Sequence, residues 1–332
     1  MRNAFVAELT ALAARDERIV LLSGDIGNRM FDDFKERFPR RFYNCGVAEA
    51  NMIGMAAGMA LSGLRPVTYT IASFTTYRCF EQIRIDLCYH NVPVIVAAVG
   101  AGLGYAANGV THHTGEDIAL MRSLPNMTVV CPGDPHEVRL ALRAASQLSG
   151  PSYLRLGKKG EPCVHAAPPD FTIGKGIELS VGSEVCILST GNMLPVAVEA
   201  AAQLNASGIS TGAVSFHTVK PLDTALLAAA FDRCRLVVTL EEHSRLGGLG
   251  GSVAEWLSDR STTKARLLRM GMNDTFLSEA GEQQHAREHY GLTAEQLATN
   301  VSQLLANSMP APKMARHAQA ADRVAPGAEQ SR

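Results

Sequence analysis

Glu49 is an acidic residue near the start of a run of small and apolar residues, 45–60, whose spacing predicts a helix. A soluble helix that apolar is buried on nearly all sides, so we expect this carboxyl to be partly desolvated. Burial favours the protonated form of a carboxyl and suits it to proton transfer. The alternative is that Glu49 only complements the partial positive charge at the helix N-terminus.

Two adjacent histidines, His112 and His113, precede a helix that is predicted to begin near Gly115. The dipole of a helix lowers the pKa of a histidine at its N-terminus, which favours the neutral imidazole. A neutral imidazole can stabilise a developing oxyanion or carry a proton. The alternative is that one histidine caps the helix while the other is solvated.

A glycine-rich loop, 100–110, leads into these histidines. Its backbone N–H groups could cradle a phosphate. However, the loop lacks the terminal lysine and hydroxyl residue of a P-loop, and it is too long for a dinucleotide-binding turn. The alternative is a mobile loop whose glycines supply positive φ angles.

Two pairs of ring side chains have helical spacing. Phe74 and Tyr77 lie three apart at the start of a predicted helix, where they can share one face. Such a face could hold an aromatic ring by stacking, although core packing is the more common use of such a pair. His285 and His289 lie four apart without an accompanying carboxylate constellation, so we expect a surface helix rather than a metal site.

The elements that must position these residues alternate between apolar strands and helices. This alternation predicts an α/β fold, in which a mostly parallel sheet is covered by helices on both faces. Such sheets bind ligands beyond the carboxyl ends of their strands, which is where Glu49, Phe74 and the histidines fall. The predicted strands are 19–23, 41–44, 66–71, 92–99 and 127–132, and the clearest helices are 48–62, 73–89 and 134–146.

A second alternating series follows a segment rich in glycine, proline and charge, which predicts an interdomain linker. The residues near the C-terminus are too poor in apolar side chains to order themselves. The predicted organisation is a first domain at 1–157, a linker at 158–183, a second α/β domain at 184–308 and a disordered tail at 309–332. The second domain has predicted strands at 185–189, 211–215 and 236–240 and helices at 193–206, 223–231 and 248–258.

The bulk composition fits a two-domain globular protein. The 332 residues are 46% hydrophobic and 19% charged, with a net charge of −1. This balance gives no reason to expect nucleic acid or an anionic membrane as a partner. No apolar run reaches the ~18 residues of a membrane span, and the first residues lack the features of a signal peptide. Seven widely spaced cysteines without a Cys-x-x-Cys pair indicate reduced thiols in a cytoplasmic protein, with neither a zinc site nor a disulfide framework.

Several motifs along the chain resemble those of the transketolase family of thiamine-diphosphate enzymes. The resemblance covers about residues 1–308 and concerns two domains of that family, the pyrimidine-binding domain and the C-terminal domain. Each motif alone is weak, but the set in this order is highly specific. The motifs are Gly46-Val47-Ala48-Glu49-Ala50-Asn51-Met52, Ser73-Phe74-Thr75-Thr76-Tyr77, Gly109-Val110-Thr111-His112-His113, Arg122-Ser123-Leu124-Pro125-Asn126-Met127, Val219-Lys220-Pro221-Leu222-Asp223, and Glu241-Glu242-His243 with Gly247-Gly248-Leu249-Gly250.

The resemblance implies which residues bind the cofactor. Glu49 matches the glutamate that bonds the ring nitrogen of the cofactor's aminopyrimidine. In the family this bond favours the imino tautomer, which removes the thiazolium proton, and the resulting ylide attacks a substrate carbonyl. Phe74 matches the residue that stacks on the pyrimidine, with Ile71 and Tyr77 as neighbouring contacts.

The resemblance also implies which residues meet the substrate. His112 matches the histidine that contacts the substrate carbonyl oxygen, and Lys158 falls near a phosphate-contacting arginine, with His113 a further candidate. Transketolases proper have an aspartate where this chain has Asn108, also a candidate substrate contact, and a histidine where it has Gly100. Both differences weaken the case for an ordinary sugar phosphate, and they leave open a modified sugar or an acyl group from a 2-oxo acid.

A partner subunit is the third implication of the resemblance. Full-length family members begin with a diphosphate-binding domain, in which a Gly-Asp-Gly motif and a later asparagine complete a magnesium site. This chain has Gly24-Asp25-Ile26-Gly27 and no following Asn-Asn motif. We therefore expect a separate N-terminal, diphosphate-binding subunit to hold the diphosphate of thiamine diphosphate and to supply the Mg²⁺ ligands, in a heterotetramer with the cofactor at the interface.

The function implied is that of the C-terminal subunit of a split transketolase-like enzyme, which transfers a two-carbon ketol or acyl unit from a ketose or 2-oxo donor to an aldehyde. Two alternatives stay open: the β subunit of the decarboxylating component of a 2-oxoacid dehydrogenase, and a non-catalytic cofactor-binding subunit. Thr111-His112-His113 favours the transketolase, whereas a requirement for a lipoyl domain would favour the dehydrogenase.

Overall fold

The first of two sheets contains most of the candidate residues at its edge. The computed structural model describes residues 1–260 and 263–307, so the predicted tail at 309–332 lies outside the described residues. Seven strands run in the order β10-β5-β6-β4-β3-β1-β2, and every neighbouring pair is parallel except β10 with β5. The strands are β1 (Ile19–Ser23), β2 (Phe42–Asn44), β3 (Arg65–Ile71), β4 (Ile95–Val99), β5 (Thr128–Val130), β6 (Ser152–Leu156) and β10 (Thr218–Lys220).

Helices cover both faces of this sheet, as the alternation in the sequence predicts. In β4, Val96 and Ala98 belong to the core cluster beneath α3, whereas Ile95, Ala97 and Val99 pack on the opposite face with α1 and α7. Side chains alternate between the faces of a strand, so a continuous apolar strand fills both cores. The helices are α1 (Arg2–Ala13), α2 (Asp32–Arg37), α3 (Glu49–Leu61), α4 (Ala72–Tyr77), α5 (Phe80–Gln82), α6 (Asp117–Ser123) and α7 (Pro135–Ala145), with a π-helix at Ile83–Tyr89.

The second sheet has five strands in the order β12-β11-β8-β9-β7, and only β7 is antiparallel to its neighbour. The two-domain α/β architecture inferred from the sequence is thereby confirmed. The strands are β7 (Ile177–Ser180), β8 (Val185–Ser189), β9 (Thr211–Ser215), β11 (Leu236–Ser244) and β12 (Arg266–Met272), and the helices are α8 (Leu194–Ala206), α9 (Thr224–Arg233), α10 (Leu249–Ser258), α11 (Gln283–His289) and α12 (Ala294–Ala306).

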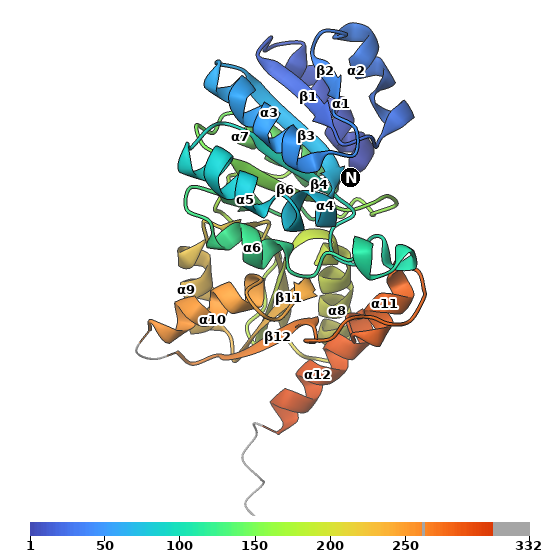
Figure 1. Cartoon of the computed structure of the whole chain (residues 1–332). Coiled ribbons are helices and arrows are strands. Elements are labelled where there is room, and N and C mark those ends of the chain that lie inside the picture. The colour runs from blue at the N-terminus through green and yellow to red at the C-terminus, as the bar shows by residue number, and fades with distance from the viewer. Residues whose placement is uncertain (261–262, 308–332) are drawn as a thin grey trace, which may run out of the picture.

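The two sheet units are joined more closely than a simple linker would allow. Figure 1 shows them stacked along the long axis, with α4 and α6 near the junction. The short strand β10 leaves the second unit and pairs with β5 of the first, where Thr218 lies opposite Val130. The segment expected as a linker, 158–183, contains β7, so the second sheet begins before residue 184. One buried cluster includes Val96 of the first unit and Leu188 of the second.

Two predicted helices differ in the structure. The single helix expected at 73–89 is divided into α4, α5 and the π-helix, because the chain leaves helical geometry at Cys79 (φ −110°, ψ 11°). The helix expected near Gly115 begins at Asp117. Apolar spacing averages over such interruptions, so it cannot locate them. Within the described part of the chain, no helix is both long and apolar enough to span a membrane.

Candidate active site

The candidate residues follow four strands of the first sheet, three of them adjacent (β6, β4 and β3) and the fourth, β2, separated from β3 by β1. Glu49 follows β2, Phe74 follows β3, the loop with His112 follows β4, and Lys158 follows β6. Parallel strands end at the same edge of a sheet, so residues far apart in sequence meet there. This edge is the candidate active site.

Glu49 is the first residue of α3 and is only 2% exposed. Its Oε2 lies 3.3 Å from Nη1 of Arg78, a side chain that is half exposed. Gly24 allows the close approach of this region, because a Cβ there would lie 2.9 Å from Oγ1 of Thr70 and 3.5 Å from Cγ of Glu49. The hydroxyl of Thr70 is buried without a hydrogen-bond partner among the described residues.

A row of side chains continues from Glu49 along the sheet edge. The guanidinium of Arg78 lies 4.3 Å from the centroid of the Phe74 ring. The ring of His112 meets Phe74 edge-on at 5.0 Å between centroids, and Tyr105 lies 6.0 Å from His112. Nζ of Lys158 lies 4.8 Å from the Tyr105 ring. The structure therefore brings Glu49, Phe74, His112 and Lys158 together, as the sequence predicts.

His112 has a lowered pKa, in the direction that the sequence analysis expects, but the cause differs. Burial is the largest contribution, followed by the charges of His113 and Arg78. Helix α6 begins five residues after His112, at Asp117. Nδ1 of His112 lies 3.0 Å from the hydroxyl of Thr111. The lowered pKa favours the neutral imidazole beside Phe74.

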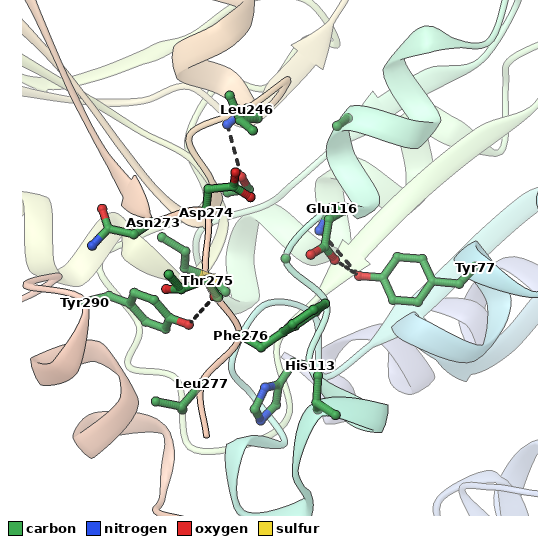
Figure 2. A pocket seen from close by; sticks show the side chains of 15 residues that line it. Tyr77, His113, Glu116, Leu246, Asn273, Asp274, Thr275, Phe276, Leu277 and Tyr290 are labelled. Atoms are coloured by element: carbon green, nitrogen blue, oxygen red, sulfur yellow. Dashed lines mark hydrogen bonds between the residues drawn. The ribbon is translucent and has the colours of Figure 1, made fainter. Parts of the chain in front are cut away.

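His113 points away from its neighbour. It is 7% exposed, and its Nε2 lies 3.1 Å from the carbonyl oxygen of Ala106. It lines a separate cleft of about 380 Å³ with Tyr77 and Phe276, between the two sheet units (Figure 2). The hydroxyl of Tyr77 donates a hydrogen bond to Glu116 on the wall of that cleft. Phe74 thus lies in the row beside Glu49, whereas Tyr77 lines the separate cleft, and the two rings do not form one stacking face.

The glycine-rich loop is tied to the protein along its first half. Gly102 and Thr114 exchange backbone hydrogen bonds of 3.1 and 2.8 Å, and Oγ of Ser73 donates to the carbonyl of Thr111. Gly100 has φ 70°, and a Cβ there would lie 2.0 Å from the Tyr105 ring. The glycines do supply positive φ angles, and they also let Tyr105 fold back against the loop.

Glu242 in β11 holds this loop from the second sheet unit. Its Oε1 accepts a 2.7 Å hydrogen bond from the backbone N–H of Leu103. The same carboxylate accepts hydrogen bonds from Gln283 and pairs with Arg287 of α11, while Asn192 approaches at 3.3 Å. Sequence analysis found Glu242 only as part of a family motif, because its contacts lie more than 40 residues away in both directions.

A buried ion pair of the first unit lies at its boundary with the second unit, beneath the site. Nε and Nη2 of Arg155 lie 2.7 and 3.0 Å from the two oxygens of Asp117, and Arg155 also donates to the carbonyl of Glu242. Burial alone would raise the pKa of Asp117, but the charge and hydrogen bonds of Arg155 hold it below its usual value. Sequence analysis predicted a role for neither residue. Arg155 is a charged residue within a buried strand, and its pairing with Asp117 depends on the tertiary fold.

The neighbouring carboxyl in β11, Glu241, faces the start of α10. It accepts 2.7 Å hydrogen bonds from the backbone N–H groups of Leu249 and Gly250. Burial nonetheless raises its pKa to about 7. Gly248 must lack a side chain, because a Cβ would lie 2.0 Å from the Glu241 carboxyl. Glu241 and the glycines after β11 therefore organise the second unit, whereas Glu242 of the same motif holds the loop that carries His112.

His285 and His289 lie on the short helix α11, as expected, and both are partly exposed. The sequence analysis found no carboxylate constellation beside them, yet Glu279 lies 3.2 Å from His285 and 3.6 Å from His289. Within residues 1–260 and 263–307, no group of three or more histidine, cysteine or acidic side chains is placed to hold a metal ion. The location of the magnesium ligands stays a prediction.

The row at the sheet edge fits an aminopyrimidine ring. A planar heterocycle with a basic ring nitrogen needs an aromatic face to stack on and a buried carboxyl at its edge. Phe74 offers such a face, and the carboxyl of Glu49 retains acceptor positions beyond its single 3.3 Å contact with Arg78. The chemistry of these side chains is therefore compatible with the pyrimidine half of thiamine diphosphate.

Comparison with known proteins agrees with this geometry. The family model "Transketolase, pyrimidine binding domain" matches residues 1–161, and "Transketolase, C-terminal domain" matches residues 174–297. A putative transketolase C-terminal section of Methanocaldococcus jannaschii is 36% identical over 304 residues, covering 91% of this chain and 95% of that protein. The chain belongs to the transketolase family. The resemblance inferred from the motifs is confirmed.

Other relatives are also separate transketolase subunits. The 6-deoxy-6-sulfo-D-fructose transketolase subunit SqwH of Clostridium sp. (strain MSTE9) is 35% identical over 298 residues, covering 90% of this chain and 92% of that protein. A solved structure described as a split gene transketolase, an inactive beta4 tetramer, is 38% identical with a TM-score of 0.83, covering 92% of this chain and 97% of that one. The chain thus corresponds to the C-terminal section of a split transketolase.

Proposed function

We propose that this transketolase chain is the C-terminal subunit of a two-subunit transferase, which moves a two-carbon ketol or acyl unit to an aldehyde acceptor. The observation that carries the proposal is the buried carboxyl of Glu49 beside the Phe74 ring, with the largely neutral His112 on the same row. These are the groups needed to bind an aminopyrimidine and to polarise a substrate carbonyl nearby.

In this proposal, Glu49 holds a proton at the ring nitrogen of the pyrimidine, and Phe74 stacks on the ring. Ile71, at the end of β3, precedes α4 and stays a candidate contact to the ring, as does Tyr77 at the end of α4, although the Tyr77 hydroxyl faces the separate cleft. When bound, thiamine diphosphate supplies the carbanion equivalent that breaks and forms the carbon–carbon bond. The burial of Glu49 keeps water from competing for its carboxyl.

The substrate would lie on the His112 side of the row. A neutral imidazole can donate a hydrogen bond to a carbonyl oxygen and stabilise the charge that develops there. Lys158 is far from Glu49 in the sequence, but its ammonium group lies over the Tyr105 ring of the row. It supplies a positive charge for an anionic group of the substrate. Asn108 and His113 stay candidate contacts, although His113 faces the separate cleft.

A modified sugar is the donor class we propose. Asn108 and Gly100 occupy the places where transketolases proper have an aspartate and a histidine, so the polar pattern offered to a sugar differs. The Asn108 amide is neutral and donates as well as accepts, unlike a carboxylate, and Gly100 has no side chain to replace an imidazole. The relative whose name specifies a sulfonated fructose supports a sugar that carries an unusual anionic group.

We further propose an N-terminal, diphosphate-binding partner that completes the site with Mg²⁺ in a heterotetramer. The separate-subunit names of the relatives support this proposal. The test is to co-purify the chain with the product of a neighbouring gene. The complex is then supplied with thiamine diphosphate, Mg²⁺, candidate ketoses, pyruvate and an aldehyde acceptor.

Glu49→Gln provides the decisive variant in this assay. We expect turnover to fall by ~10²–10⁴, the usual contribution of general acid–base groups, while the complex still assembles. Glu81→Gln is the matched control, since Glu81 is 68% exposed and pairs with Arg84 on the surface. Unchanged turnover in Glu49→Gln would overturn the assignment. Turnover of 2-oxo acids that requires a lipoyl domain would instead identify a dehydrogenase component.

A further inference from the structure

Arg78 makes two contacts at the site that no motif assigned to it. Its Nη1 lies 3.3 Å from Oε2 of the buried Glu49, and its guanidinium carbon lies 4.3 Å from the centroid of the Phe74 ring. One planar group thus touches both the carboxyl and the aromatic face. Arg78 is the C-cap of α4, just before the chain leaves helical geometry at Cys79.

The guanidinium resembles an aminopyrimidine in the features that these two residues recognise. Both groups are flat, both carry N–H donors at an edge, and both stack on aromatic rings. The proposed function assigns the Glu49 carboxyl and the Phe74 face to the cofactor's pyrimidine. A pyrimidine that uses that face and that carboxyl together would overlap the present position of the Arg78 guanidinium.

We infer that Arg78 competes with the cofactor's pyrimidine for Glu49 and Phe74 and must swing away when thiamine diphosphate binds. This inference rests on the proposed function. Arg78 gives the buried carboxylate a cationic partner before the cofactor arrives, which avoids an unpaired charge at the base of the site. The side chain is half exposed, so it can turn towards solvent without disturbing the core.

The competition is expected to be modest. A cation–π contact at an exposed position and a partly solvated ion pair each contribute little free energy. Together they correspond to about a three- to tenfold effect on an equilibrium constant. Arg78 would therefore slow and weaken cofactor binding without preventing it.

The test is calorimetric titration of thiamine diphosphate with Mg²⁺ into the assembled complex. We expect Arg78→Ala to bind the cofactor about three- to tenfold more tightly, and also to bind it faster in stopped-flow measurements. Arg78→Lys keeps the charge but lacks the planar guanidinium, so its affinity for the cofactor should lie between those of the wild type and Arg78→Ala. Arg84→Ala is the matched control, because Arg84 is 54% exposed and pairs with Glu81 away from Glu49.

The sign of the change separates competition from a structural role. Loss of a structural contact would weaken cofactor binding, so weaker or unchanged binding in Arg78→Ala overturns the inference, provided that thermal unfolding shows a folded complex. Glu49→Gln and Phe74→Ala test the proposed function in the same titration. If both weaken binding while Arg78→Ala does not strengthen it, only the Arg78 inference falls. If the wild-type complex binds no cofactor, the proposed function falls first.

Discussion

His112 shows how one residue's chemistry depends on its immediate surroundings. Burial is the main reason for its lowered pKa, and the neighbouring His113 and Arg78 add to the effect. A lowered pKa means that the imidazole stays neutral to a lower pH than a free histidine does. Activity that requires the neutral form should therefore persist below pH 6.5 and decline only as the pH falls through the pKa of His112.

We predict that His112 titrates below 6.5, the ordinary pKa of a histidine, in an NMR titration of the chain. Arg78→Ala should move the pKa upward, towards 6.5, because one nearby positive charge is removed. The resonance is assigned by comparison with His112→Asn. A pKa at or above 6.5 in the wild-type chain would contradict this account of the site.

Sequence analysis could find residues whose type and spacing already suggest chemistry. Glu49, Phe74 and His112 belong to local motifs, and the structure brings them into one row. Arg78 and Glu242 were missed as functional residues because their importance comes from tertiary contacts. The partners of Glu242 include Leu103, 139 residues away along the chain, and no local pattern encodes such a contact.

At the scale of elements, β11 acts as a support for the loop after β4. Glu242 accepts from the N–H of Leu103 and is itself held by Arg287 of α11. The carboxylate is fully buried, so its hydrogen bonds are shielded from water. The second sheet unit therefore positions the loop that carries His112, although its own residues lie outside the row.

We predict that Glu242→Ala loosens this loop. Hydrogen exchange at the amide of Leu103 should accelerate by about tenfold or more, because a buried donor loses its acceptor. Amides of β8 should keep their protection, which would show that the second sheet is intact. Glu288→Ala is the control, because the Glu288 side chain is exposed and accepts a hydrogen bond from Gln284 of the same helix. Unchanged exchange at Leu103 would contradict a supporting role for Glu242.

Four strands were not predicted from the sequence, and each was missed for a physical reason. Strand β6 contains the buried Arg155, so it does not read as a continuous apolar run. Strand β12 contains Arg266 and Arg269, and its first residues are partly exposed. Strand β7 alternates between half-buried and exposed residues at a sheet edge, within a segment whose composition indicated a linker. Strand β10 has only three residues.

At the scale of the whole molecule, the two sheet units share a core. Strand β10 completes the first sheet, and Arg155 of the first unit, buried with its partner Asp117, donates a 3.0 Å hydrogen bond to the carbonyl of Glu242 in the second. Neither unit retains all its contacts when the other unfolds. Shared contacts of this kind favour cooperative unfolding of the two units together.

We predict a single unfolding transition for the chain. The one tryptophan, Trp256, lies on α10 of the second unit, so its fluorescence reports that unit. Hydrogen exchange of β4 amides reports the first unit, and both probes should give the same denaturant midpoint. Asp117→Asn should lower the free energy of unfolding by about 3–5 kcal/mol, because it breaks a buried ion pair, with the midpoints still coinciding. Two separated midpoints in the wild-type chain would contradict the shared core.

The central claim is that this chain provides only the pyrimidine side of a site completed by another subunit. The most direct measurement is calorimetric titration of thiamine diphosphate with Mg²⁺ into the chain alone, the partner alone and their mixture. We predict tight, magnesium-dependent binding in the mixture and much weaker binding in either chain alone. Tight magnesium-dependent binding by this chain alone would contradict the account.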